Sequence, residues 1–190
     1  MTILTPMRPK QVLKPETMTR GYHVPGWVWQ PKIDDERAVL RVLDGQLFNR
    51  QGQPFDRQKA RPFGEACDSL RTIYGGHEWI DIGLIGYRDS QTFAASRGAV
   101  IVFDLPSLNG DPWVSRRQQL ITRLPVLDLI AGEVAKFGLV YRFADEELAG
   151  ELFHRTRGVP GLEGVVGRLL AGPYVQGETE TMAKARWKRA

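Results

Sequence analysis

Short segments of the chain alternate hydrophobic and polar residues with a period of two, which is typical of half-buried β-strands. In the segment 37–42, Ala38, Leu40 and Val42 occupy alternate positions. Asp44-Gly45 then predicts a hairpin turn into a strand at 46–49. Further strands are predicted from Trp27 onward and at 78–87, 98–105, 139–143, 163–169 and 183–187.

Helices are predicted between these strands. A short helix covers 65–73 and ends near the glycines at 75 and 76. Ser115 is the predicted N-cap of a helix through residue 124, and Pro125 separates it from a second piece that runs to residue 137. A further helix opens at residue 145 and carries its apolar residues on one side.

The sum of these elements predicts an α+β fold with antiparallel β-sheets and flanking helices. Residues 1–26 contain Pro9, Pro15 and Pro25 with little periodicity, so they are predicted as a loose basic arm. Residues 27–190 are predicted as one folded domain, which suits a chain of 190 residues.

Composition narrows the class of protein. Hydrophobic residues are 42% and charged residues 25% of the chain, as in ordinary globular domains. No window approaches the roughly 18 apolar residues of a membrane span, and the N-terminus has no apolar signal region, so no membrane association is expected. The single cysteine, Cys67, excludes an internal disulfide and fits the cytoplasm, which is the expected location. Three scattered histidines make a zinc site unexpected.

The net charge is +4, and basic residues gather at both ends of the chain. They are solvated tails, or they bind a phosphate-rich partner by releasing its counterions, and the charge alone leaves both open. The residues concerned are Arg8, Lys10, Lys14, Arg20, Lys184, Arg186, Lys188 and Arg189.

Lys32 is the first candidate for covalent chemistry. It opens the segment Lys32-Ile33-Asp34-Asp35-Glu36-Arg37, although a lone K-x-D-x-x-R can also be an ordinary surface sequence. A nucleophilic lysine needs a lowered pKa, which neighbouring cations or desolvation provide. The candidate cations are Arg37, Arg50, Lys184 and Arg186, and the fold must bring them together.

The segment resembles the first signature of the covalent nucleotidyltransferases, K-x-D-G with a nearby arginine. The chain as a whole, over 27–187, is similar to the adenylation domain of ATP-dependent DNA ligases, in a superfamily that includes RNA ligases and mRNA capping guanylyltransferases. Asp35 stands at the glycine position of the signature. The resemblance implies that Lys32 forms a lysyl-adenylate and that Arg37 lies close to the nucleotide.

Three further residues take nucleotide-binding roles from this resemblance. Gln30 occupies the place that often reads the adenine amino group, and Arg50 precedes a glycine-containing turn that would contact the sugar and the nucleic-acid phosphate. Phe103, in Val102-Phe103-Asp104-Leu105, would stack on adenine. A hairpin arginine and a core aromatic are the alternative interpretations of Arg50 and Phe103.

The family's third signature, D-G-E-L, is altered in this chain. The corresponding segment is Asp81-Ile82-Gly83-Leu84, with glycine in place of the glutamate that holds the ribose. Either Asp81 serves instead from the same strand, also as a metal ligand, or ribose recognition is weakened.

The last two signatures lie near the C-terminus. Glu163-Gly164-Val165-Val166-Gly167-Arg168 fits the pattern of a glutamate, a glycine, two apolar residues and a basic residue, which implies that Glu163 helps to position a divalent cation. Lys184-Ala185-Arg186 resembles the closing K-x-K, whose cations would neutralise the α-phosphate and assist catalysis. An ordinary basic tail is the alternative interpretation of this pair. Lys188 and Arg189, which follow it, are predicted to contact nucleic acid.

The resemblance implies an ATP-dependent polynucleotide ligase, with DNA favoured, that uses ATP and Mg²⁺ and seals nicked double-stranded nucleic acid. An OB-fold usually follows the final signature, so the sequence suggests a minimal form that acts alone or with a partner protein supplying that role. The alternatives are an RNA ligase, a capping-type guanylyltransferase, a non-catalytic nucleic-acid-binding module with the same fold, and a basic structural domain.

Overall fold

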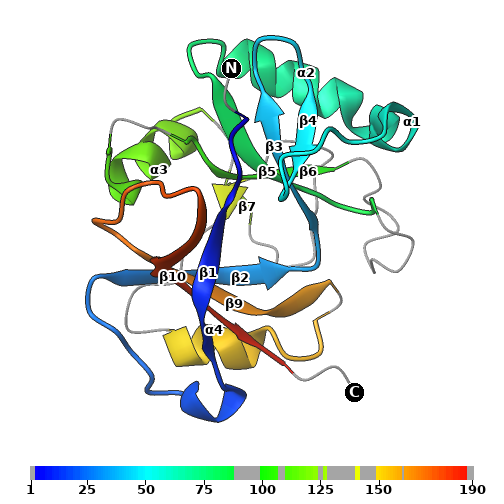
Figure 1. Ribbon diagram of the computed structural model, residues 1–190. Coiled ribbons are helices and arrows are strands. Elements are labelled where there is room, and N and C mark those ends of the chain that lie inside the picture. The colour runs from blue at the N-terminus through cyan, green and yellow to red at the C-terminus, as the bar shows by residue number, and fades with distance from the viewer. Residues whose placement is uncertain are drawn as a thin grey trace.

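Two four-stranded sheets form the framework of the protein in the computed structural model, which describes residues 3–87, 99–106, 110–123, 126–127, 140–141, 149–159 and 161–187 (Figure 1). The first sheet has the order β1-β10-β9-β2 and the second the order β4-β3-β5-β6. The predicted α+β class with antiparallel sheets and flanking helices is confirmed.

The bounds of the strands follow the sequence prediction closely in most places. The first sheet contains β1 (Met7–Leu13), β2 (Trp27–Ile33), β9 (Leu162–Leu169) and β10 (Gly177–Arg186). The second contains β3 (Glu36–Arg41), β4 (Leu47–Asn49), β5 (Trp79–Leu84) and β6 (Val100–Asp104). A short parallel pair joins β7 (Val126–Leu127) and β8 (Val140–Tyr141).

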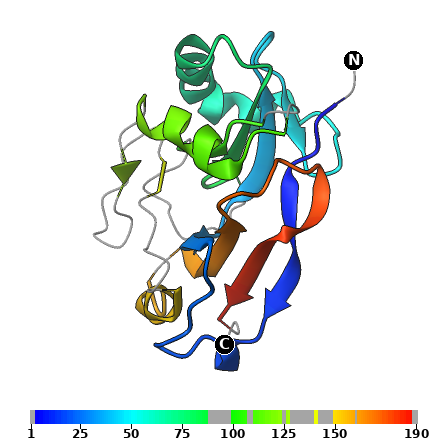
Figure 2. The same ribbon diagram turned by 90° about the vertical axis from the view of Figure 1, so that its left-hand side faces the viewer.

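The N-terminal segment is not the loose arm that the prolines suggested. Its residues 7–13 form β1, which runs parallel to β10 at the edge of the first sheet, as Figure 2 shows. Leu4, Met7 and Met18 are buried, and a 3₁₀ turn at Pro15–Thr17 follows the strand. The expectation was wrong because the partner strand lies some 170 residues away, where no local pattern reports it.

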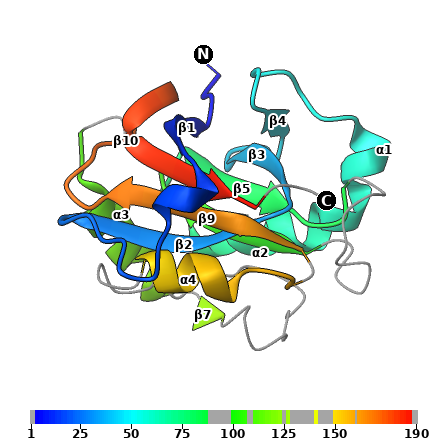
Figure 3. The ribbon, with the colours of Figure 1, turned by 90° about the horizontal axis from the view of Figure 1, so that it is seen from below.

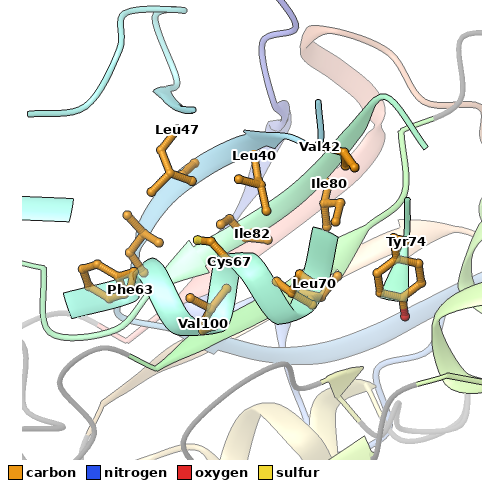
Figure 4. Close-up of a cluster of buried hydrophobic side chains, with 14 of the residues drawn as sticks. Leu40, Val42, Leu47, Phe63, Cys67, Leu70, Tyr74, Ile80, Ile82 and Val100 are labelled. Carbon is orange, nitrogen blue, oxygen red and sulfur yellow. The ribbon is translucent and has the colours of Figure 1, made fainter. Parts of the chain in front are cut away.

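Helix α2 (Gly64–Ile73) covers the outer face of the second sheet. Cys67 and Leu70 point from the helix toward Leu40, Ile82 and Val100 on the strands (Figure 4). This packing explains the alternation of apolar residues predicted for β3. Residues 38 and 40 face α2, whereas residues 37 and 39 face the first sheet. Helix α1 (Arg57–Ala60) and the 3₁₀ turn η2 (Arg61–Phe63) lead into α2.

Helix α4 (Ala149–Arg155) lies beneath the outer face of the first sheet, as seen from below in Figure 3. Leu152 and Phe153 pack there against Trp29 and Ala185. Every second residue of β2 packs against α4. The residues between them, Gln30 and Lys32, therefore face the second sheet.

Buried ion pairs join the two sheets. Asp104 of β6 forms two ion pairs, each with an N–O distance of 2.8 Å. One partner is Arg116 of α3 (Trp113–Ile121) and the other is Arg168 of β9, and all three residues are almost fully buried. Such paired charges are costly to bury and costly to break, so they fix how the sheets sit on each other.

Two expectations about helices need correction or fall outside the described residues. Helix α3 begins at Trp113 after Pro112, two residues before the predicted cap Ser115, and ends at Ile121. The predicted helix to residue 137 and the start of the helix at 145 lie outside the described residues. No helix in the described part of the chain is long and apolar enough to cross a membrane.

Candidate active site

A pocket of about 600 Å³ opens between the two sheets. The first sheet and the second both contribute side chains to its lining, and so does the β2–β3 connection. Eight residues that the sequence predicts to bind the nucleotide lie here, although they come from distant parts of the chain. They are Gln30, Lys32, Arg37, Arg50, Phe103, Glu163, Lys184 and Arg186.

Strand register places the basic residues of the first sheet in rows. Gly164 of β9 pairs with Lys32 of β2 on one side and with Arg186 of β10 on the other. One step along, Val166 pairs with Gln30 and with Lys184. Residues two apart in a strand share a face, so the lysine and both terminal cations lie on the face that lines the pocket.

A β-bulge sets Glu163 beside the lysine. Lys32 pairs with Gly164, but Ile33 pairs with Leu162, so Glu163 is an extra residue on β9 at this point. Bulges re-aim side chains next to functional sites. The carboxylate consequently meets Lys32, with Nζ 2.5 Å from Oε2, and also Arg186, with Nη2 3.4 Å from the same oxygen.

Gly164 allows three strands to approach at this point. Its φ is +140°, and a Cβ there would lie 3.0 Å from the Ala185 carbonyl carbon and closer still to its oxygen. Only glycine fits this combination, so the glutamate-glycine pair is explained locally by the bulge and by the approach of β10.

The cations of β10 differ in exposure. The Arg186 side chain is half exposed, whereas Lys184 is partly buried. Burial lowers the pKa of the Lys184 amine, and the positive charges of Arg186 and Lys32 lower it further. The pocket therefore concentrates positive charge where a phosphate could neutralise it.

A second bulge sets Phe103. Ile82 of β5 pairs with Val102, but Asp81 pairs with Asp104, which leaves Phe103 as the extra residue on β6. Its ring lines the pocket but is only 6% exposed, and the Arg37 guanidinium carbon lies 4.4 Å from its centroid. Its role as the platform for adenine stays a prediction.

Asp81, which the sequence suggested as a metal or sugar ligand, is not among the residues that line the pocket. Its carboxylate is fully buried and accepts two hydrogen bonds from Arg37, at 2.5 and 2.6 Å, and one from the Tyr174 hydroxyl at 3.0 Å. A carboxylate so engaged holds Arg37 in place and is not available to a ligand. The sequence could not predict this burial, because the residues that surround Asp81 come from β3 and from the segment before β10, far away in the chain.

The other residues predicted to contact ligands differ in where they lie relative to the pocket. Gln30 is buried at the pocket wall, and Arg50 is exposed at its rim. Lys188 and Arg189 lie outside the described residues. Arg8, which the sequence analysis placed among the basic residues of the arm and not in the nucleotide site, lines the pocket from β1. Its buried Nε has no hydrogen-bond partner among the described residues.

The fit of the site to a divalent cation rests on Glu163. Among the described residues no group of three or more histidine, cysteine, aspartate or glutamate side chains is placed to hold a metal. Mg²⁺ usually takes one or two carboxylates and completes its shell with substrate phosphates and water. Glu163 in a pocket with room for a nucleotide fits that requirement.

Comparison with known proteins identifies the fold. No family model matches the sequence, and no curated protein sequence does so either. Among solved structures, the ligase domain of M. tuberculosis LigD aligns with 96% of this chain at a TM-score of 0.65 and 16% identity. The Chlorella virus DNA ligase-adenylate aligns with 98% at 0.59 and 19% identity, and a Lig E DNA ligase with 98% at 0.59 and 16%.

The chain has the fold of an ATP-dependent DNA ligase nucleotidyltransferase domain. The fold implied by the resemblance of the motifs is therefore confirmed. The chain spans 59% of the LigD ligase domain, 69% of the Chlorella virus ligase and 70% of the Lig E ligase. At these identities the likeness extends to the fold, and the roles of individual residues depend on the pocket.

Proposed function

We propose that this chain is a covalent nucleotidyltransferase that transfers AMP from ATP to Lys32 and then to a polynucleotide end, as an ATP-dependent polynucleotide ligase with DNA as the favoured substrate. One observation carries the proposal. Lys32 lies in a pocket of nucleotide size with Glu163 at 2.5 Å, and Lys184 and Arg186 line the same pocket.

The first step is nucleophilic substitution at phosphorus. The unprotonated Nζ of Lys32 attacks the α-phosphorus of ATP, a P–N bond forms, and the P–O bond to pyrophosphate breaks. Nζ has to lose a proton first, and Glu163 Oε2 is an acceptor within hydrogen-bond reach. The pyrophosphate leaves with the negative charge.

Positive charge around the α-phosphate supplies much of the acceleration. Lys184 and Arg186 are held on β10 opposite the same stretch of β9, so they need little rearrangement to meet a phosphate. Bound Mg²⁺ would add charge neutralisation at the phosphates, with Glu163 as its protein ligand.

The choice of polymer is supported by the similar structures. The proteins of similar fold are named DNA ligases, and one mycobacterial DNA ligase D is described as a complex with ATP. AMP would pass from Lys32 to the 5′-phosphate at a nick, and the 3′-hydroxyl would displace it to close the strand. Arg50, which lines the pocket and is exposed, would contact the phosphate of that end.

Covalent labelling tests the proposal. Purified protein is incubated with α-labelled ATP and Mg²⁺ and separated by denaturing electrophoresis. We expect label on the wild type and none on Lys32→Arg, which keeps the charge but changes the nucleophile. Lys10→Arg is the matched control, because Lys10 lies in an exposed ion pair with Glu180 on β10, and it should label normally. Equal labelling of Lys32→Arg would reject the proposal.

Three further substrates distinguish the activities. Labelled enzyme is mixed with a nicked DNA duplex, and separately with a nicked RNA duplex, to see which is sealed. Preference for GTP over ATP in the labelling step would indicate a guanylyltransferase. Salt-sensitive DNA binding without any covalent adduct would indicate a non-catalytic binding module.

A further inference from the structure

Two of the positions at which the motifs depart from the ligase pattern, Asp35 and Gly83, lie against each other. Asp35 belongs to the two-residue connection between β2 and β3, and Gly83 lies on β5 opposite Arg37. A Cβ on Gly83 would come 2.9 Å from Asp35 Cγ and closer still to Oδ2. The Asp35 carboxylate therefore fills the space that a side chain at position 83 would need.

This carboxylate belongs to the pocket. Asp35 is one of the lining residues, and its Oδ2 is buried with no hydrogen-bond partner among the residues that the structure describes. Burial raises the pKa of the carboxyl to about 6, against the opposing effect of Lys32 and Arg37. A buried acceptor without a donor is unfavourable, so the position suits a ligand that brings hydroxyl groups.

The position of Asp35 identifies which part of a nucleotide it would meet. The same Cβ on Gly83 would lie 2.7 Å from Phe103 Cε2, so the carboxylate sits beside that ring. Lys32 and Glu163 line the same pocket, and their charges act on the carboxylate. In a nucleotide the sugar joins the base to the α-phosphate, so a carboxylate that lies beside the aromatic ring, in the pocket of the nucleophilic amine, is in reach of the sugar.

We propose that Asp35 accepts hydrogen bonds from the ribose hydroxyl groups of ATP and makes the pocket select ribonucleotides over deoxyribonucleotides. The inference rests on the proposed function. An ionised carboxylate has two acceptor oxygens, enough for both hydroxyls of a vicinal diol. A site that pairs with a hydroxyl rejects an analogue lacking it, because the buried acceptor is left without a donor.

The first experiment compares labelling by α-labelled ATP and 2′-deoxy-ATP at limiting nucleotide. We expect the wild type to prefer ATP by at least about tenfold and Asp35→Ala to lose most of that preference. Glu180→Gln, which removes an exposed carboxylate of β10 that does not line the pocket, is the matched control and should keep the preference. If Asp35→Ala keeps the wild-type ratio of ATP to 2′-deoxy-ATP labelling, the assignment is overturned, whether or not its requirement for Mg²⁺ changes.

A second experiment moves the carboxylate back to β5. Asp35→Gly should lose sugar discrimination, and the double variant Asp35→Gly/Gly83→Glu should regain part of it. Gly83→Glu alone should weaken binding of both nucleotides, because Asp35 already occupies the space. Discrimination that stays lost in the double variant, when thermal melting shows that it is folded, counts against the proposal.

Equilibrium binding separates this inference from the proposed function. Binding of ATP and 2′-deoxy-ATP to Lys32→Ala, and to the same variant with Asp35→Ala, requires no covalent step. If the preference for ATP persists in Lys32→Ala and disappears with Asp35→Ala, Asp35 has the proposed role even when the wild type forms no adduct. If neither nucleotide binds, both proposals fail.

Discussion

At the scale of single residues, the pocket concentrates charges that are only partly balanced. One carboxylate, Glu163, is shared by Lys32 and Arg186, while the Oδ2 atom of Asp35 is buried without a hydrogen-bond donor among the described residues. Functional sites commonly hold such groups at a cost in stability. The cost can be measured at Asp35, because its titration differs between the folded and unfolded chain.

Asp35→Asn is expected to stabilise the protein at pH 7.5 and not at pH 4. The pKa of Asp35 is raised from 3.8 to about 6 by burial, so the folded state binds the proton more tightly than the unfolded state does. The stability that this protonation supplies is complete below pH 3.8 and is lost as the pH rises through 6. The variant escapes that loss, which is at most about 3 kcal/mol.

Urea unfolding of both proteins between pH 4 and 8 measures this difference. The gain in the unfolding free energy of Asp35→Asn should grow as the pH rises from 4 to 7. A variant that is less stable than the wild type at pH 7.5 would show that the ionised carboxylate is stabilised in the fold.

At the scale of elements, two bulges and one glycine determine where the functional side chains point. Glu163 and Phe103 are each the extra residue of a bulge, one in each sheet. The sequence predicts both strands correctly but gives no sign of the bulges, because register depends on the partner strand. Their effect was visible only through the motif positions, which predicted these two residues without giving a physical reason.

Gly164→Ala is expected to disrupt the site by displacing β10 from β9. The new methyl group would overlap the Ala185 carbonyl, which separates β9 from β10 where Glu163 and Arg186 meet. We expect labelling by ATP to fall at least tenfold and the unfolding free energy to decrease by about 2–4 kcal/mol.

Gly177→Ala is the matched control for this change. Gly177 has a φ of +80° at the start of β10, but no atom lies within 4 Å of the added Cβ. It should lose about 1–2 kcal/mol from backbone strain alone and keep its labelling rate. Equal loss of labelling in both variants would show that the close approach of β10 does not matter for the site.

At the scale of the whole molecule, the pocket lies between two sheets that are joined by buried charges. Arg116 of α3 and Arg168 of β9 both pair with Asp104 of β6, whereas Arg37 pairs with Asp81 within the second sheet. The sequence shows which residues are basic and acidic, but it does not predict that they are buried, because their burial follows from how the sheets pack. For the same reason the sequence misplaced β1 in a loose arm and gave Asp81 a ligand-binding role.

Asp104→Asn is expected to weaken this junction strongly. Two buried guanidinium groups would lose their charged partner, which costs about 3–5 kcal/mol. The urea midpoint should fall accordingly. Glu180→Gln, which removes the carboxylate from the exposed pair with Lys10, should change it little. A small effect at Asp104 would show that the sheets are held mainly by their apolar contacts.

Peptide mapping of the adenylated protein tests the central claim most directly. After incubation with ATP and Mg²⁺, the protein is digested and the peptides are sequenced by mass spectrometry under conditions that preserve a phosphoramidate. We expect AMP on Lys32 and on no other residue, and loss of the adduct when pyrophosphate is added. AMP on Lys184 or another side chain, or no adduct under any condition, would contradict the assignment of Lys32 as the nucleophile.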